Sequence, residues 1–395
     1  MRPLKIKPGK FVLHPMKHLH FTQSLEPLQG GGMGAAAVAL HQEFLRAGFS
    51  SSLYSTHGGE AQNPAPQCHE FRRIGPAPLY FSPQLARVCS GLVRQVDVLH
   101  GHGLYVGTNY LFGREARRQH KPLVYHVHGF FEPYIRQRSR WKKRMVNWLF
   151  ESANTRNVRL WRALTAREAD QIRSFGYRQP IVVASNGLAL PAFSPPAKPP
   201  ECIETPLAGP LRKQKKRLLF LARVHPKKGL NLLLQVWASL GSFRRDWELI
   251  IAGPDELNHM QEIRTLAVSL GIEREIVFTG TVVGRAKIDL FYSADAYVLP
   301  SFSEGMPMSL IEAMACNLPV IATRECNMPA ITLASSGWEC PAESKPLAQT
   351  LAEALQASPA ELIQRGRNGR RLVEMNYSWP SIAATILQAC SAHCV

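Results

Sequence analysis

The chain has 395 residues, and 45% of them are hydrophobic, which provides for a sizeable core and excludes an intrinsically disordered protein. This length predicts two or three domains. Lysine and arginine outnumber aspartate and glutamate by 47 to 29, and the net charge of +18 favours an anionic partner: nucleic acid, a membrane surface or a phosphorylated small molecule.

The amino-terminal residues are basic and proline-rich. Pro3, Pro8 and Pro15 interrupt any apolar run, so we expect a short disordered arm and neither a signal peptide nor a membrane span. The eight cysteines are irregularly spaced and form no C-x-x-C pair, which indicates reduced thiols in a cytoplasmic protein.

Short apolar runs, each followed by a stretch of helical periodicity, recur along the chain. Strands that alternate with helices in this way predict parallel sheets covered on both faces, and therefore an α/β fold of two doubly wound, Rossmann-like domains. The strands are expected at 18–23, 52–55, 96–100, 123–127 and 181–184 in the first half, and at 216–224, 247–252, 275–279, 296–300 and 319–323 in the second.

A proline-rich stretch separates the two halves. Proline at this density is expected to continue neither strand nor helix, so we interpret 191–212 as an exposed linker between domains at 17–190 and 213–377. Ligands of such sheets bind beyond the carboxyl ends of the strands. The predicted site is therefore a central cleft between the two facing sheets.

Glycines 30 to 32 and Gly34 follow the first expected strand and precede an expected helix at 35–46. Glycines at this place let backbone amides, including those of Gly31 and Gly32, approach an anion at the positive end of a helix. The alternative is a tight turn without a ligand.

Three H-x-H pairs place imidazoles on one face of an extended strand: His18 with His20, His100 with His102, and His126 with His128. No further ligand stands at a spacing typical of a metal site, so we expect no metal there. We interpret most of these histidines as residues near strand ends.

In the second half, Arg223 and Lys228-Gly229 follow the first expected strand. A guanidinium and an ammonium at the carboxyl end of a strand suit a diphosphate. The alternative is a solvated basic loop, of which a chain with this net charge has several.

The most specific pattern is the run 301–312, after another buried strand. Pro307 suits the first turn of a helix, Gly305 allows close backbone approach, and the amides of Met306, Met308 and Ser309 could bind a phosphate. Two carboxylates near such a helix tip, Glu304 and Glu312, are costly unless they serve ligand hydroxyls, such as those of a sugar and a ribose. The alternative for Glu304 is a simple helix cap.

These motifs together resemble the retaining glycosyltransferases of the GT-B fold, glycosyltransferase family 4 (group 1). The resemblance rests on two glutamates with seven residues between them and on an Arg…Lys-Gly pair. The first half of the chain resembles the subgroup of this family that often builds exopolysaccharide. The matching segments are 96–105, 127–134, 165–176, 185–187, 223–229, 249–256, 276–280, 304–312 and 316–323.

The resemblance implies a role for each site residue. Arg223 and Lys228 would neutralise the donor diphosphate, Glu304 would contact the transferred sugar, Glu312 would bind the ribose, and His128 would lie near the reacting centre. A helix at 378–395 would complete the first domain. Further donor contacts would come from Thr279, Gly280, Gly305, Met306, Pro307, Met308 and Ser309, and phosphate or acceptor contacts from Gly31 and Gly32.

Two departures from the family pattern stand out. The Asn-Gly-Val-Asp of many relatives reads Asn186-Gly187-Leu188-Ala189 here, and the acidic or hydroxyl residue that often follows the glycine pair is replaced by Met33-Gly34-Ala35. The second departure bears on acceptor contacts, and neither removes a donor-site residue.

The implied activity is sugar transfer from a nucleotide-diphosphate sugar to a glycan or polyprenyl-phosphate-linked acceptor in exopolysaccharide or lipopolysaccharide synthesis. Neither a metal nor another cofactor is expected, because no Asp-x-Asp signature accompanies the motifs. Two alternatives remain: another GT-B enzyme such as a nucleotide-sugar epimerase, and a non-catalytic basic nucleic-acid-binding protein, although no known nucleic-acid-binding motif is present.

The densest basic run, Arg136–Arg144, lies in the first half. Trp141, Met145 and Trp148 recur on one helical face beside its cations, which predicts peripheral binding to anionic lipid on the inner face of the plasma membrane. The alternative is a core-facing stripe with a solvated basic back.

Overall fold

The computed structural model describes residues 16–61, 63–75, 80–131, 151–195, 202–212 and 215–394. The chain forms two compact units. The first unit comprises Met1–Ala184 together with Ile382–Val395, and the second comprises Ser185–Ser381. The boundary falls at Ala184, a few residues before the end of the domain expected from sequence, and the carboxyl-terminal segment returns to the first unit.

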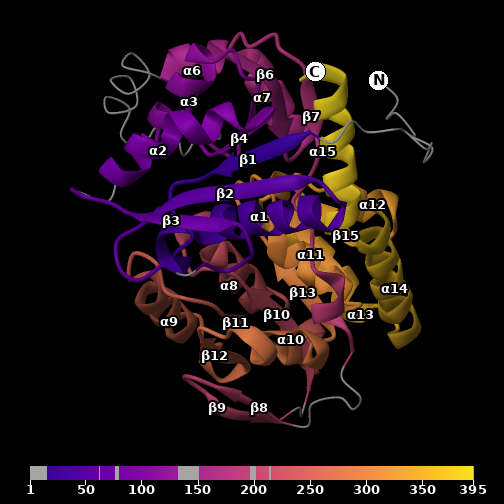
Figure 1. The fold of residues 1–395 in the computed structure, drawn as a ribbon. Helices are drawn as coiled ribbons and strands as arrows, with labels where there is room; N and C mark the ends of the chain where they lie inside the picture. Colours follow the sequence, from indigo (N-terminus) through magenta and orange to yellow (C-terminus); the bar gives the residue numbers. More distant parts are fainter. Residues whose placement is uncertain are drawn as a thin grey trace. The chain divides into compact units, whose positions relative to one another are not determined.

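The first unit is built on a seven-stranded sheet in the order β3-β2-β1-β4-β5-β6-β7, and all its strand pairs are parallel (Figure 1). The strands are β1 (Lys17–Phe21), β2 (Ser50–His57), β3 (Cys68–Arg72), β4 (Val98–His102), β5 (Leu123–His126), β6 (Val158–Ala163) and β7 (Ile181–Val183). The helices are α1 (Pro27–Arg46), α2 (Pro83–Arg94), α3 (Gly107–Arg118), α6 (Ser152–Arg156), α7 (Ala166–Ser174) and α15 (Trp379–His393).

The second unit contains a six-stranded parallel sheet in the order β12-β11-β10-β13-β14-β15. Its strands are β10 (Lys216–Leu221), β11 (Trp247–Ala252), β12 (Ile276–Gly280), β13 (Ala296–Leu299), β14 (Val320–Thr323) and β15 (Gly337–Cys340). The helices are α8 (Leu230–Ser239), α9 (His259–Ser269), α10 (Gly284–Ser293), α11 (Met308–Ala315), α12 (Ala330–Leu333), α13 (Ser344–Gln356) and α14 (Pro359–Asn376).

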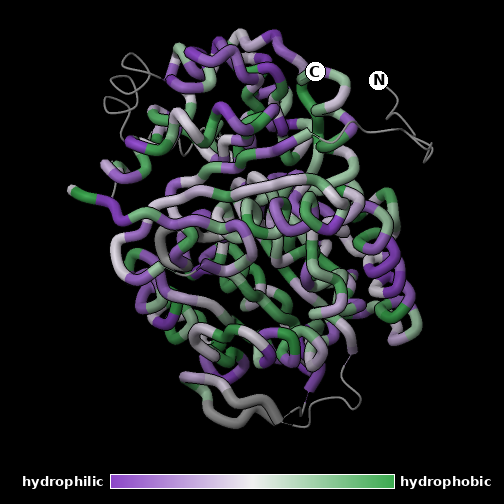
Figure 2. Tube along the Cα trace, viewed as in Figure 1, coloured by the Kyte–Doolittle hydropathy of each residue, from purple (hydrophilic) through white to green (hydrophobic). Residues whose placement is uncertain are grey.

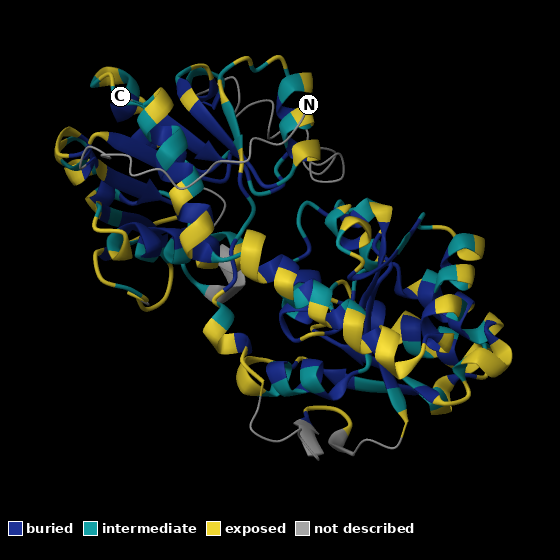
Figure 3. Ribbon diagram, turned by 90° about the vertical axis from the view of Figure 1, so that its right-hand side faces the viewer, coloured by how far each residue is buried: buried dark blue, intermediate teal, exposed yellow. Residues whose placement is uncertain are grey.

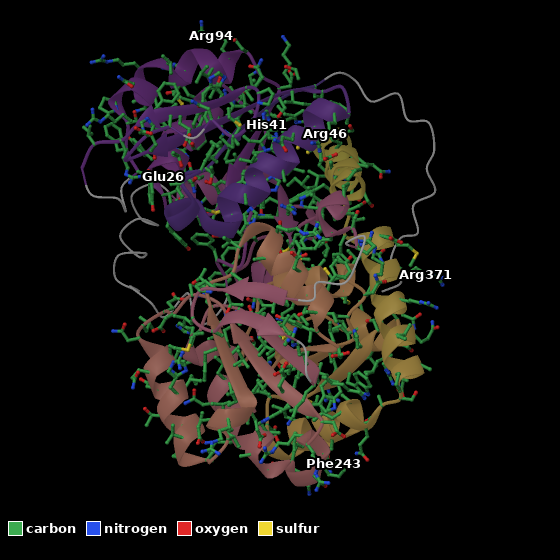
Figure 4. The ribbon with its side chains drawn as sticks, turned by 90° about the horizontal axis from the view of Figure 1, so that it is seen from below. Glu26, His41, Arg46, Arg94, Phe243 and Arg371 are labelled. Atoms are coloured by element: carbon green, nitrogen blue, oxygen red, sulfur yellow. The ribbon has the colours of Figure 1, made fainter. Side chains whose placement is uncertain are left out.

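The burial pattern explains why these segments form a covered parallel sheet. Every residue of the central strands β4, β13 and β14 is buried, as expected of strands that have helices on both faces. The strands are mainly dark blue in Figure 3, and along the helices in Figure 2 hydrophilic and hydrophobic residues alternate. The α/β fold predicted from sequence, with two Rossmann-like units, is confirmed.

Side-chain caps start several of the helices. Ser82 accepts a hydrogen bond from the Leu85 amide at 3.4 Å, and Pro83 takes the first position of α2. Thr165 caps α7 in the same way through the Glu168 amide at 3.2 Å. Such a cap satisfies one of the amides that the first helical turn leaves unpaired.

The glycine segment differs from the prediction. Gly31 and Gly32 lie within the first turns of α1, which begins at Pro27, and not in a loop before a helix at 35–46. Proline has the backbone torsion of a first helical residue and so starts the helix early. Gly34 has a packing role, because a Cβ there would lie 2.8 Å from the Ser24 carbonyl oxygen.

The predicted linker also contains regular structure. Leu190–Phe193 form a 3₁₀ turn, and β8 (Cys202–Thr205) pairs antiparallel with β9 (Gly209–Arg212) in a separate hairpin. The prolines are compatible with this arrangement because a two-stranded hairpin consists of edge strands alone, where a missing amide need not break a ladder. In the turn of the hairpin, the Leu207 amide donates to the Thr279 carbonyl at 3.0 Å.

Among the described helices, none has both the length and the apolar character needed to cross a membrane.

Gly229 lies in the loop after β10 and packs closely against Pro300, which follows β13. Its φ is 74°, and a Cβ would lie 2.0 Å from the Pro300 carbonyl oxygen, whereas Gly241 has φ 55° and open space around it. We predict that Gly241→Ala lowers the free energy of unfolding by about 1 kcal/mol through the left-handed backbone alone. Gly229→Ala should cost at least about 2 kcal/mol more because of the backbone clash.

Urea unfolding of the two variants beside the wild type measures this difference. Equal losses of stability would show that the contact between Gly229 and Pro300 does not constrain the fold.

Candidate functional site

The predicted donor residues gather at the carboxyl edge of the second sheet. The strand order reverses between β10 and β13: β11 and β12 lie on one side, and β14 and β15 on the other. At such a switch point the following helices diverge, which leaves a crevice where ligands bind. Lys228 follows β10 and Glu304 follows β13, so their loops meet at this point.

Lys228 and Glu304 form an ion pair in a nearly closed environment. The Lys228 Nζ lies 2.6 Å from Glu304 Oε1, and the side chains are only 13% and 9% exposed. The Ser301 hydroxyl donates to the same oxygen at 2.6 Å. Glu304 Oε2 makes no hydrogen bond to any described residue, so one carboxylate oxygen stays available to a ligand.

Backbone contacts position Lys228. The turn Pro226–Lys228 begins at His225, whose Nδ1 accepts from the Lys227 amide at 3.0 Å. The Lys227 carbonyl in turn accepts from the Phe302 amide at 2.9 Å. The loops after β10 and β13 are thereby joined beside the ion pair.

The Glu304 backbone is also held. Its amide donates to the Glu325 carbonyl at 2.9 Å, and the Asn327 side-chain amide donates to its carbonyl. The N-cap of α11 is Pro307, and no side chain of the described residues caps that helix. The alternative interpretation of Glu304 as a helix cap is therefore wrong.

The tip of α11 presents unpaired amides. Met308 and Ser309 occupy its first turn, where amides lack intrahelical partners and the helix dipole favours an anion. The Tyr297 hydroxyl lies 2.7 Å from Ser309 Oγ and 3.0 Å from the Leu221 carbonyl, which ties the helix to the central strands. Gly305, Met306, Met308 and Ser309 are partly exposed, and Pro307 is buried.

Glu312 lies on α11, within hydrogen-bonding distance of Lys287 on α10. The Lys287 Nζ and Glu312 Oε1 are 2.7 Å apart, and the two side chains are 25% and 16% exposed. A carboxylate held by a single ammonium keeps acceptor positions for hydroxyl groups.

Arg223 is paired with Glu256 at 2.7 Å, and its side chain is 62% exposed. An exposed pair of this kind contributes little to stability, so Arg223 is loosely held. Among the described residues, no ion pair joins Arg223 to Glu304. The structure thus brings Lys228 and Glu304 together, whereas Arg223, on the same loop as Lys228, pairs with Glu256 instead.

Thr279 and Gly280 lie at the end of β12. The Thr279 side chain is buried and its hydroxyl is 3.1 Å from the Gly280 carbonyl, while its own carbonyl accepts from Leu207. This carbonyl is already occupied by the hairpin, so it is not free to accept a hydrogen bond from a donor nucleotide.

His128 belongs to the first unit, directly after β5. Its φ of 52° is rare for a residue other than glycine, and Gly129 follows with φ 82°. The buried Glu168 carboxylate bridges this turn, accepting from the Gly129 amide at 2.5 Å and the Leu164 amide at 2.6 Å. Burial lowers the pKa of His128 to about 3, and the nearby charge of Arg162 acts in the same direction, so the imidazole is neutral.

Most of the H-x-H histidines lie near strand ends, as interpreted: His102 and His126 are the last residues of β4 and β5. Their burial was not predicted. His18, His20, His100, His102 and His126 lie within β1, β4 and β5 and are buried. Their rings form a hydrogen-bonded array, which is described below. The basic run Arg136–Arg144 lies outside the described residues, and its role stays a prediction.

Four residues of the site were not predicted. Ser301 and Glu256 lie in the segments 301–312 and 249–256. Their position shortly after a predicted strand was the signal that sequence offered. Lys287 gave no signal, because it reaches Glu312 from a different helix. Glu168 stood in the segment 165–176, where a carboxylate three residues after a capping threonine marks a helix start.

Comparison with protein families identifies both units. Residues 206–371 match the model "Glycosyl transferases group 1", and residues 30–190 match the model "Glycosyltransferase Family 4". A putative colanic acid biosynthesis glycosyltransferase, WcaL of Escherichia coli K12, is 30% identical over 54% of this chain and 52% of its own length. The MMP α-(1→4)-mannosyltransferase of Mycolicibacterium hassiacum is 29% identical over 78% of this chain and 74% of its own length.

The chain thus spans about half the length of the first of these relatives and about three quarters of the second.

Solved structures show the same fold. Anabaena HepE in complex with UDP has a TM-score of 0.75 at 19% identity, over 95% of this chain and all of that chain. WaaG, a glycosyltransferase involved in lipopolysaccharide biosynthesis, has a TM-score of 0.65 at 19% identity, over 94% and 99% of the two chains. With its two parallel sheets and both family matches, the chain belongs to the GT-B glycosyltransferases that carry family 4 and group 1 domains.

Proposed function

We propose that the protein transfers a sugar from a nucleotide-diphosphate donor to a glycan or polyprenyl-phosphate-linked acceptor, with retention of the anomeric configuration. The observation that carries the proposal is the Lys228–Ser301–Glu304 cluster beside the uncapped tip of α11. This arrangement offers an ammonium, free amides and a carboxylate oxygen within one crevice, which suits a sugar attached to a phosphate.

Each group has a defined part in the reaction. Lys228 and Arg223 neutralise the diphosphate as the bond between the anomeric carbon and the phosphate oxygen breaks, and the α11 amides stabilise the developing charge. Glu304 Oε2 accepts from a sugar hydroxyl, and Glu312 accepts from the ribose. The acceptor oxygen bonds to the anomeric carbon, and its proton leaves with the nucleoside diphosphate.

His128 contributes from the first unit. Because its imidazole is neutral, it acts by hydrogen bonding to the sugar and does not supply a positive charge.

The names of the relatives support an acceptor from cell-surface polysaccharide. One is a putative colanic acid biosynthesis enzyme, and another is the lipopolysaccharide core mannosyltransferase LpsB of Rhizobium meliloti. HepE has been solved with UDP-glucose, which supports a nucleotide-sugar donor for this chain as well.

A panel of nucleotide sugars tests the proposal. We expect one donor to raise the melting temperature and to release its nucleoside diphosphate only when a glycan or lipid-linked acceptor is present. Conversion of the donor to another nucleotide sugar without an acceptor would identify an epimerase instead. Salt-sensitive binding to DNA or RNA, with no effect of any nucleotide sugar, would identify a nucleic-acid-binding protein.

Glu304→Gln and Lys228→Ala test the central pair. Glu304→Gln removes the charge that Lys228 and Ser301 contact, and Lys228→Ala removes the ammonium that we assign to the diphosphate. We predict that each variant loses at least about a hundredfold in kcat/KM, the scale of one removed charge-stabilising group. Steady-state kinetics with the identified donor measures this loss.

Glu374→Gln is the matched control, because Glu374 pairs with Arg370 in a half-exposed salt bridge on α14. It should keep wild-type turnover, and thermal unfolding should show all three variants folded. Near-normal turnover of either site variant would remove that residue from the mechanism.

Metal dependence gives a separate prediction. Since Lys228, Arg223 and the α11 amides supply positive charge to the diphosphate, we expect turnover to survive an excess of EDTA. The rate of nucleoside diphosphate release, compared with and without EDTA, measures this dependence on metal. Loss of turnover in EDTA and its recovery on addition of manganese would contradict the assignment of these groups.

A further inference from the structure

Six histidines of the first unit form a two-row array, and all but the half-buried His128 are buried. Five of them lie on β1, β4 and β5, and His128 follows β5. These strands are neighbours at the switch point of the first sheet, where the strand order reverses between β1 and β4. On β1 and on β4 the two histidines are separated by one residue, so their rings lie on the same side of the sheet. Hydrogen bonds join His126 and His128 to these rings. Phe44 of α1 packs edge-on against His18 at 4.8 Å and against His20 at 5.1 Å, so α1 covers this end of the array.

The first row, which we name the Arg162 row, consists of His18, His100 and His126. His18 Nδ1 lies 3.0 Å from His100 Nε2, His100 Nδ1 lies 3.1 Å from His126 Nε2, and Arg162 lies 3.3 Å from His126 Nδ1.

A guanidinium can only donate, so His126 Nδ1 must accept, and its proton sits on Nε2. The same reasoning passes along the row and places the proton of all three rings on Nε2. The row ends at His18 Nε2, a buried N–H without a partner among the described residues.

The second row, which we name the His128 row, consists of His20, His102 and His128. His20 Nδ1 lies 3.1 Å from His102 Nε2, and His102 Nδ1 lies 3.1 Å from His128 Nε2. One end is therefore the residue that we assign to the sugar. The other end, His20 Nε2, is buried and has no hydrogen-bond partner among the described residues.

The array is uncharged. Burial lowers the pKa of His20, His100, His102 and His126 well below the usual value, and that of His18 to about 4. A neutral imidazole has one donor and one acceptor nitrogen. The three rings of the His128 row must therefore carry their protons on the same nitrogen, either all on Nδ1 or all on Nε2.

Two features favour protonation of the His128 row on Nδ1. A proton on Nε2 would leave a second buried N–H unpaired at His20, beside the one at His18, and unpaired buried N–H groups are rarer than unpaired acceptors. The rows also stack, with His20 on His100 at 4.4 Å and His102 on His126 at 4.3 Å.

Dipoles that lie side by side are lowest in energy when they point in opposite directions. The stacking therefore favours a His128 row whose N–H groups point away from β1, opposite to those of the Arg162 row. Burial lowers the pKa of Arg162 to about 10, and the nearby Glu168 carboxylate acts in the opposite direction. The negative charge of Glu168 partly offsets the field of the Arg162 guanidinium at the two rows.

We propose that the His128 row locks a tautomer: His102, supported by His20, holds His128 with its proton on Nδ1, so that His128 meets the donor sugar as a neutral hydrogen-bond donor. His102 and His20 are positioning residues: among the described residues only His102 is hydrogen-bonded to the His128 ring, and neither His102 nor His20 is exposed. This inference rests on the proposed function for its consequence in turnover, but not for the tautomer itself.

Nitrogen NMR of the full-length protein, labelled at the histidine rings and free of substrate, tests the tautomer. We expect Nδ1–H signals for His20, His102 and His128, and Nε2–H signals for His100 and His126. Single substitutions of each histidine assign the signals. An Nε2–H form of His128, or different tautomers within the His128 row, would overturn the proposal whether or not the protein is a glycosyltransferase.

Turnover tests the consequence. His102→Leu removes the contact with His128, and we expect kcat to fall about tenfold to a hundredfold, the range for groups that orient a functional histidine, with little change in the donor KM. His102→Asn should restore most of kcat, because its side-chain amide takes the place of Nδ1 and can donate to His128 Nε2.

His100→Leu is the matched control. It removes a buried histidine from the same strand and the same face, but it breaks the hydrogen bonds of the Arg162 row, none of which reaches His128. We expect similar losses of stability in His100→Leu and His102→Leu, and a near-normal kcat only in the former. Equal losses of kcat, or no rescue by His102→Asn, would show that the histidines serve packing alone.

Discussion

The reversal of strand order in each sheet is the constraint on which the site depends. In the first sheet it falls between β1 and β4, and in the second between β10 and β13. Helices that follow the two strands leave in opposite directions, so the loops at this edge are not covered by a crossover. Chain segments that are far apart in sequence, such as those of Lys228 and Glu304, are brought together by this winding alone.

The two switch points solve the same desolvation problem by different chemistry. In the second unit, a charged lysine is stabilised by a glutamate that also accepts from Ser301. In the first unit, burial removes the charge, and neutral imidazoles satisfy one another's hydrogen bonds. The ion pair is suited to exchange its partners with a charged ligand, whereas the histidine rows are suited to hold one ring in a fixed state.

Much of the fold could be predicted from the sequence because the central strands are buried on both faces and read as continuous apolar runs. The strand at 247–252 was predicted with the bounds that the structure shows. β3, β6 and β15 were not predicted. β3 is an edge strand of mostly polar residues, and β6 contains Arg162, which is fully buried but looks like a surface residue in sequence.

The site was only partly predictable, because a motif names residues and not their partners. The run 301–312 indicated that Glu304 faces a ligand, but its contact with Lys228 depends on the adjacency of β10 and β13. The H-x-H pairs illustrate the same limit. Each pair alone indicates two rings on one face, and only the parallel register of β1, β4 and β5 aligns them into rows.

The register also explains why the histidine array extends to a functional residue. His102 lies opposite His126 in the ladder, so its hydrogen bond runs diagonally to His128, two residues further along the chain. The left-handed backbone of His128, with its turn held by Glu168, brings the ring back over the sheet edge. A residue beyond the strand end is thereby tied to the buried centre of its unit, which gives a loop residue the fixed orientation of a core residue.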